Sequence, residues 1–82
     1  MMKAHVYVTL KNSVLDPQGQ TIHNALRKIG FGEVSAVRQG KYFQISLADG
    51  TSGDAARDQV ERIARDVLTN PVIEEYTYRI EE

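Results

Sequence analysis

The sequence predicts a single α+β domain in which four strands and two helices follow one another in the order β-α-β-β-α-β. Three observations lead to this prediction. Alternating apolar and polar residues mark short strands with one buried face. Apolar residues at helical spacing mark two helices, each lying between strands. The length of 82 residues allows only one domain, expected to span 1–82.

The first strand is expected over residues 3–11, because every second residue there is apolar. A helix then begins at Pro17, whose fixed φ suits the first helical position. Asp16 stands just before it, where a carboxylate can accept hydrogen bonds from the free amides of a helix start. Gly30 is expected to end this helix as a left-handed cap.

Two further strands are expected over residues 34–38 and 42–47. Residues 39–41 separate them and contain a glycine, which suits a tight hairpin turn. A loop rich in glycine, serine and aspartate leads into the second helix. Its apolar stripe is expected to consist of Ala56, Val60, Ile63, Ala64 and Val67. Asn70 and Pro71 end this helix, and the last strand runs over residues 72–80.

This order is the split βαβ pattern of ferredoxin-like domains. We therefore expect a mostly antiparallel four-stranded sheet with both helices on one face. The other face would be solvated or covered by a second chain. A chain of this size buries a modest core and can gain stability by forming oligomers. We expect a contact between copies on the open face or at a sheet edge, involving Tyr7, Thr9 and Gln44.

Composition excludes several classes of function. The absence of cysteine excludes disulfides, thiol nucleophiles and thiolate metal sites. A net charge of −1 argues against a nucleic-acid partner, which selects for a basic face. The chain enters its first strand without an apolar leader, and no apolar run reaches membrane-spanning length. We expect a cytoplasmic protein that does not bind membranes.

No arrangement of residues indicates catalysis. His5 and His23 lie on different elements, with no carboxylate at a spacing that favours a metal site. Glu74 and Glu75 are neighbours on a strand, so their side chains point to opposite faces and cannot act together. We therefore expect no catalytic, cofactor-binding or metal-binding residue, and a function that depends on partners.

Several segments resemble, in order and spacing, those of the PurS family, the small subunit of phosphoribosylformylglycinamidine (FGAM) synthase. The resemblance runs nearly end to end and departs only around residues 50–54. The segments that carry it are 6–11 (VYVTLK), 14–19 (VLDPQG), 25–26 (AL), 30–31 (GF), 37–42 (VRQGKY) and 68–76 (LTNPVIEEY).

The resemblance implies a role in an ATP-dependent ligase of purine biosynthesis that takes ammonia from glutamine. In that family a large synthetase subunit, PurL, holds the ATP site, and with it Mg²⁺. A glutaminase subunit, PurQ, holds a cysteine nucleophile. The small subunit is a homodimer or tetramer without an active site. It bridges the other two subunits and supports ammonia transfer between them.

The same segments are the expected contacts with those partners. The predicted contact residues are Asp16, Gln18, Gly19, Arg38, Lys41, Tyr42, Asn70, Val72 and Glu74. For each segment a purely structural role is the alternative: a helix start, a hairpin and a helix stop. The alternative function is a free-standing ferredoxin-like regulatory module that binds a small metabolite between protomers.

Overall fold

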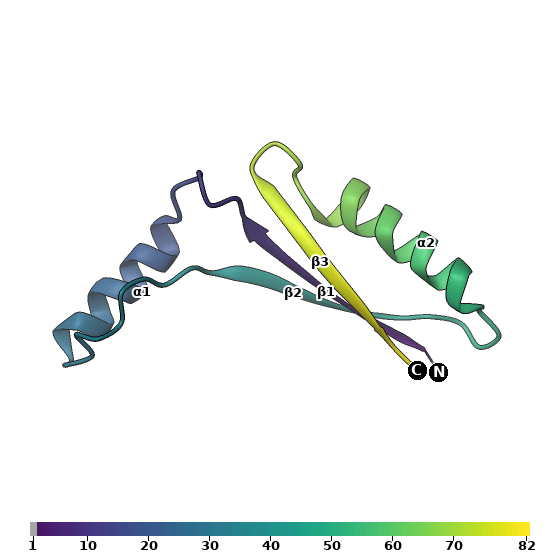
Figure 1. The fold of residues 1–82 in the computed structure, drawn as a ribbon, viewed down its shortest axis with the longest axis horizontal. Helices are drawn as coiled ribbons and strands as arrows, with labels where there is room; N and C mark the ends of the chain where they lie inside the picture. The colour runs from purple at the N-terminus through teal and green to yellow at the C-terminus, as the bar shows by residue number, and fades with distance from the viewer. Residues whose placement is uncertain (1) are drawn as a thin grey trace.

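A computed structural model describes residues 2–82 of the chain. Three strands and two α-helices follow one another along the chain, and the second helix continues into a π-helical turn (Figure 1). The elements are β1 (Lys3–Leu10), α1 (Pro17–Lys28), β2 (Gly40–Ser46), α2 (Gly53–Ile63), the π-helical turn η1 (Ala64–Leu68) and β3 (Glu74–Glu81).

The strands form one antiparallel sheet in the order β2-β1-β3. The α+β class is confirmed, but the prediction of four strands is wrong. Residues 34–38 form no strand, and the chain does not turn back at residues 39–41. Gly40 instead opens β2 and pairs with Thr9 of β1. The expected hairpin is therefore straightened into one extended segment.

The core lies between the sheet and α2. Alternate residues of β1 point toward the helix and are fully buried, as the period of two in a strand requires. They meet the small residues on one side of α2, which let the helix lie close to the sheet. The buried core consists of Ala4, Val6, Val8, Leu47, Ala56, Val60 and Ala64.

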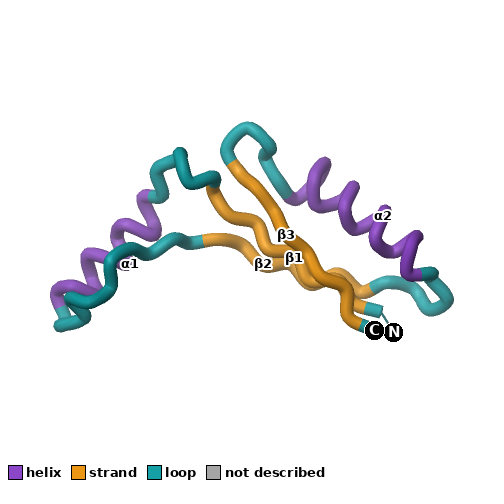
Figure 2. Tube along the Cα trace, in the orientation of Figure 1, coloured by secondary structure: helices purple, strands orange, loops and turns teal. Residues whose placement is uncertain are grey.

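The helix α1 does not lie on the sheet, so the expectation of two helices on one face is wrong. It extends past the end of β1 where Leu10 lies, as an arm (Figures 1 and 2). The molecule is consequently elongated, with extents of 51 × 26 × 14 Å. Gly19 is the only buried residue of this helix. The predicted start at Pro17 is confirmed, and Gly30 adopts a positive φ of 106° just after the helix.

The π-helical turn changes which residues of the second helix are buried. A π turn holds more residues than an α turn, so it rotates the following side chains around the helix axis. Val67, expected on the buried stripe, is 74% exposed. Leu68 packs against the core in its place.

No helix of residues 2–82 combines the length and apolarity needed to cross a membrane.

Candidate partner-binding site

The candidate site lies where α1 joins the sheet. There the structure brings together three segments that the sequence analysis predicted as partner contacts. We call this set of side chains the hinge cluster: Asp16, Gln18, Arg38, Gln39, Lys41 and Glu74. A cavity of about 180 Å³ lies among them, with Val8, Leu10 and Gly40 completing its lining. Arg38 belongs to the cluster but lies outside this cavity.

Asp16 connects the start of α1 to residues 29–39, the segment that leads from α1 to β2 and that we call the return chain. One carboxylate oxygen accepts a hydrogen bond from the amide of Gly19 at 3.0 Å, which caps α1. The other accepts from the amide of Gln39 at 2.6 Å. Both bonds hold the pKa of the Asp16 carboxyl below its ordinary value, and the bond from Gln39 has the larger effect. The predicted cap is therefore confirmed, and it also fixes the hinge.

Arg38 holds the chain that connects β1 to α1. Its Nη2 atom donates to the carbonyl oxygens of Lys11 at 3.0 Å and Val14 at 3.1 Å. A longer bond of 3.4 Å reaches the carbonyl of Leu10. The guanidinium thus stabilises the connection between sheet and arm and is already occupied within this chain.

Glu74 fastens the start of β3 to β2. Its carboxylate lies 3.2 Å from the Nζ atom of Lys41 and accepts a hydrogen bond from the amide of Asn70 at 2.8 Å. The hydrogen bond from the Asn70 amide lowers the pKa of the Glu74 carboxyl most, and Lys41 lowers it further. The side chain of Asn70 in turn accepts from the amide of Val72 at 3.1 Å. Asn70 therefore shapes the loop before β3.

Gln39 is a member of the cluster that sequence reasoning missed. Its backbone amide binds Asp16, and its side-chain amide donates to the side chain of Gln18. Only a long-range contact across the hinge reveals this role, because glutamine carries no local signal for it. Val72 was predicted and is 78% exposed beside the cluster, so it remains free for a partner.

Tyr42 is the predicted contact residue that the structure separates from the others. It lies on the open face of the sheet, where its ring stacks on Tyr7 with centroids 5.2 Å apart. The His5 ring also stacks on Tyr42, with centroids 5.8 Å apart. The Nδ1 atom of His5 forms a hydrogen bond with the Tyr42 hydroxyl. Thr9 and Gln44 share this face. Their assignment to a contact between copies stays a prediction.

The acidic members of the hinge cluster predict how stability depends on pH. Both Asp16 and Glu74 have carboxyl pKa values lowered by folding, from ordinary values of 3.8 and 4.5. Their contribution is present above the unfolded-state pKa and is lost as pH falls through the folded-state pKa. We expect the melting temperature to decrease as the pH is lowered below about 4.5. Thermal scans of Asp16→Asn and Glu74→Gln should show a shallower fall, and slopes identical to that of the unmodified chain would contradict this.

Polar groups of the hinge cluster hold segments of this chain to one another. Only Asp16 among them is buried, and most of the others are exposed. Within residues 2–82, no three His, Asp or Glu side chains gather closely enough to hold a metal ion. Large apolar side chains remain at the surface of the arm and of the loop before β3. Fold and site define a small α+β protein that presents surfaces for other chains.

Comparison with known proteins gives the family. The family model described as PurS, phosphoribosylformylglycinamidine (FGAM) synthase, matches residues 3–82. The chain belongs to the PurS family. The PurS subunit of Bacillus subtilis is 42% identical over 83 residues, covering all of this chain and 95% of its own.

Solved structures agree with this assignment. The PurS structure of Methanocaldococcus jannaschii has a TM-score of 0.88 at 35% identity, covering 100% of this chain and 98% of its own. That protein is described as one of the subunits of formylglycinamide ribonucleotide amidotransferase in the purine biosynthetic pathway. A chain of the PurLQS structure from Thermotoga maritima has a TM-score of 0.75 at 25% identity, covering 99% of both chains.

Proposed function

We propose that this chain is the small, non-catalytic subunit of FGAM synthase and that it joins the synthetase and glutaminase subunits. The observation that carries the proposal is the full-length match to a chain of PurLQS, an assembly of three kinds of subunit. The family match over residues 3–82 supports it. The alternative of a free-standing regulatory module is not favoured, because the relatives are named as subunits of one synthase.

The chemistry of the assembly explains why a subunit without an active site is needed. The synthetase consumes ATP and formylglycinamide ribonucleotide, and the glutaminase releases ammonia from glutamine. Ammonia that escapes into water is protonated and no longer a nucleophile. A subunit that fixes the two sites in register raises the effective concentration of ammonia at the synthetase. ATP and Mg²⁺ would bind the large subunit.

The test is co-purification. A tagged form of this chain is expected to retain both the large synthetase subunit and the glutaminase from the same organism, in the presence of ATP, Mg²⁺ and glutamine. The same tag on an unrelated protein of similar size is the control. Retention of neither subunit under these conditions would contradict the proposal.

We infer that the hinge cluster places its exposed neighbour Val72 against a partner subunit. Burial of an exposed apolar side chain stabilises an interface, and replacing it by lysine puts a charge there. We expect Val72→Lys to weaken retention of a partner roughly tenfold, about 1.4 kcal/mol. Asp49→Lys is the control, because Asp49 lies in the loop between β2 and α2, at the other end of the sheet. Equal retention by both variants would exclude Val72 from the contact.

A further inference from the structure

We propose that the link between Asp49 and Gly50 rearranges spontaneously to isoaspartate in the folded chain, which makes the loop between β2 and α2 a site of covalent modification. This loop includes residues 50–54, where the resemblance to the family departs, and the function proposed above makes no use of it. The pair is the only place in the sequence where an aspartate or asparagine precedes a glycine. The chemistry is independent of any role in the synthase.

The rearrangement passes through a five-membered succinimide ring. The Gly50 nitrogen bonds to Cγ of the protonated Asp49 carboxyl and loses its proton, and this proton leaves with the carboxyl hydroxyl as water. A water molecule then opens the ring at either carbonyl. Opening at the main-chain carbonyl of Asp49 leaves a chain that runs through Cβ and Cγ, and the former main-chain carbonyl becomes a free carboxylate. The two steps release and consume one water molecule and involve no oxidant or reductant.

The turn that holds the pair favours the first step. Thr51 donates to the carbonyl of Ala48 from its amide at 3.3 Å and from its hydroxyl at 2.7 Å, which closes a turn centred on the pair. Gly50 has a φ of 86° and Asp49 has a negative φ, so the turn is of type II. A flip of the central peptide converts it to type I and rotates ψ of Asp49 from about +120° to about −30°. Rotation by way of 180° carries the Gly50 nitrogen past the Asp49 carboxyl.

Both reacting groups are unrestrained in the part of the chain that the structure describes. The Gly50 amide makes no hydrogen bond there, so the flip breaks none. Asp49 is exposed, and its carboxylate joins no ion pair with residues 2–82. A Cβ built on Gly50 would meet no atom within 4 Å, so the turn stands clear of the rest of the chain. The fold therefore leaves the carboxyl and the amide free to react.

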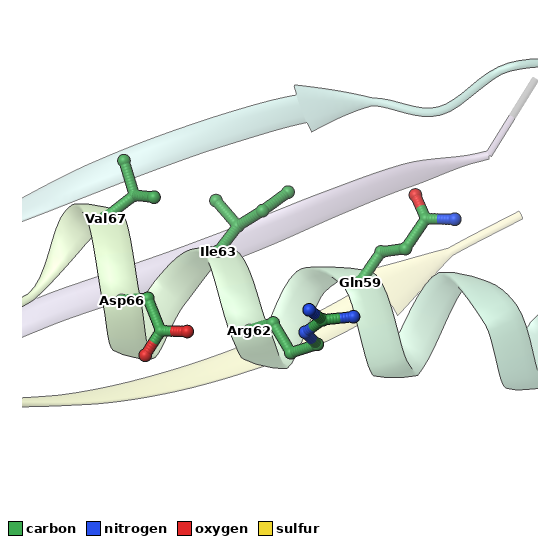
Figure 3. Close-up of a pocket in the computed structure, with 5 residues that line it drawn as sticks. All are labelled: Gln59, Arg62, Ile63, Asp66 and Val67. Atoms are coloured by element: carbon green, nitrogen blue, oxygen red, sulfur yellow. The ribbon is translucent and has the colours of Figure 1, made fainter.

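The other aspartates lie where the fold opposes the same reaction. Asp54 and Asp58 lie in α2, and Asp66 lies in η1 beside the β-branched Val67 (Figure 3). A helix fixes ψ of each residue and commits the following amides to hydrogen bonds along the helix. Asp16 precedes a proline, which has no amide proton to lose. These residues are therefore internal controls for the site at Asp49.

Isoaspartate changes the way in which β2 is joined to α2. It adds one carbon to the main chain between two anchored points and leaves the net charge unchanged. Before the turn, Leu47 is buried and its amide donates to the carbonyl of Met2 at 2.9 Å. After the turn, the Ser52 hydroxyl accepts from the amide of Ala55 at 3.1 Å and caps α2. A longer link disturbs the fit between these points, so we expect the modified chain to melt at a lower temperature.

Ageing of the full chain in mildly acidic buffer, with circular dichroism to verify that it stays folded, tests the proposal. Trypsin cuts after Lys41 and Arg57 and releases residues 42–57 as one peptide. The aged sample should give a second peptide of equal mass that a protease specific for aspartate no longer cuts before residue 49 but still cuts before Asp54. The rate in the folded chain should be within about tenfold of that in the free synthetic peptide, a barrier difference of at most about 1.4 kcal/mol. A rate below that range, or a block before Asp54 instead, would overturn the proposal.

Two conservative variants assign the second peptide to one residue. Asp49→Glu should abolish it, because glutamate would have to form a six-membered ring, which closes more slowly. Asp54→Glu changes the same tryptic peptide and should leave the signal unchanged. On ageing, the melting temperature of the unmodified chain should decrease, whereas that of Asp49→Glu should stay constant. A second peptide that persists in Asp49→Glu would overturn the site, and equal changes in melting temperature would overturn its effect on the fold.

Discussion

Glutamine-dependent synthesis of FGAM is expected to fall about 100-fold when this chain is omitted from a mixture of the large synthetase and the glutaminase subunits, the lower end of the gain that tethering provides. Synthesis from added ammonium salt should stay unchanged, because we propose that the synthetase site lies in the large subunit. The loss therefore concerns the delivery of ammonia. Measuring FGAM formation with glutamine and with ammonium salt, each with and without the chain, separates an effect on ammonia delivery from an effect on the synthetase reaction.

Variants of this chain sharpen the same measurement. Adding back the unmodified chain should restore the glutamine-dependent rate, and Gly32→Ala should restore it equally, since a methyl group there meets open space. Val72→Lys should need a higher concentration to reach the same rate, because it weakens assembly rather than chemistry. Full glutamine-dependent activity in the absence of the chain would disprove the assembly role.

The local parts of the fold could be predicted from the sequence. The alternation in β1 identified its buried face, and Asp16 with Pro17 identified the start of α1. Both signals involve residues within a few positions of each other, where strand periodicity and helix capping act. The structure confirms each of them.

The arrangement at residues 39–41 could not be predicted, because it depends on contacts between distant residues. A glycine between two strand-like segments fits a hairpin locally. In the structure Gln39 donates to Asp16, which lies 23 positions earlier, and Gly40 pairs with Thr9. These contacts hold the segment straight, and no local pattern of residues reports them.

The candidate site was predicted in part. The resemblance selected the three segments that meet at the hinge, and the structure places Asp16, Gln18, Lys41 and Glu74 around one cavity. The resemblance could not tell which side chains have no bonding partner within the chain. Arg38 and Glu74 turned out to be occupied by partners within the chain. Tyr42 points to the open face, because alternate residues of β2 face opposite sides of the sheet.

Gly19→Ala is expected to destabilise the chain by about 1–3 kcal/mol, the usual effect of adding a methyl group to a tightly packed place. A Cβ at this position would lie 2.4 Å from the carbonyl oxygen of Val37 and 2.7 Å from the Asp16 carboxylate. The carbonyl belongs to the backbone of the return chain, so it can move only if the hinge opens. Urea or thermal unfolding measures the loss.

The sign of this effect distinguishes close packing from helix propensity. In an open helical position, alanine in place of glycine stabilises by about 1 kcal/mol. A destabilised Gly19→Ala therefore reports the contact between α1 and the return chain, whereas a stabilised variant would show that the hinge yields without cost. Gly32→Ala is the matched control, with a change expected within about 0.5 kcal/mol. If Gly19→Ala also loses the bond from Gln39 to Asp16, its melting temperature should respond less to acid than that of the unmodified chain, because the Asp16 carboxyl is then less strongly stabilised in its charged form.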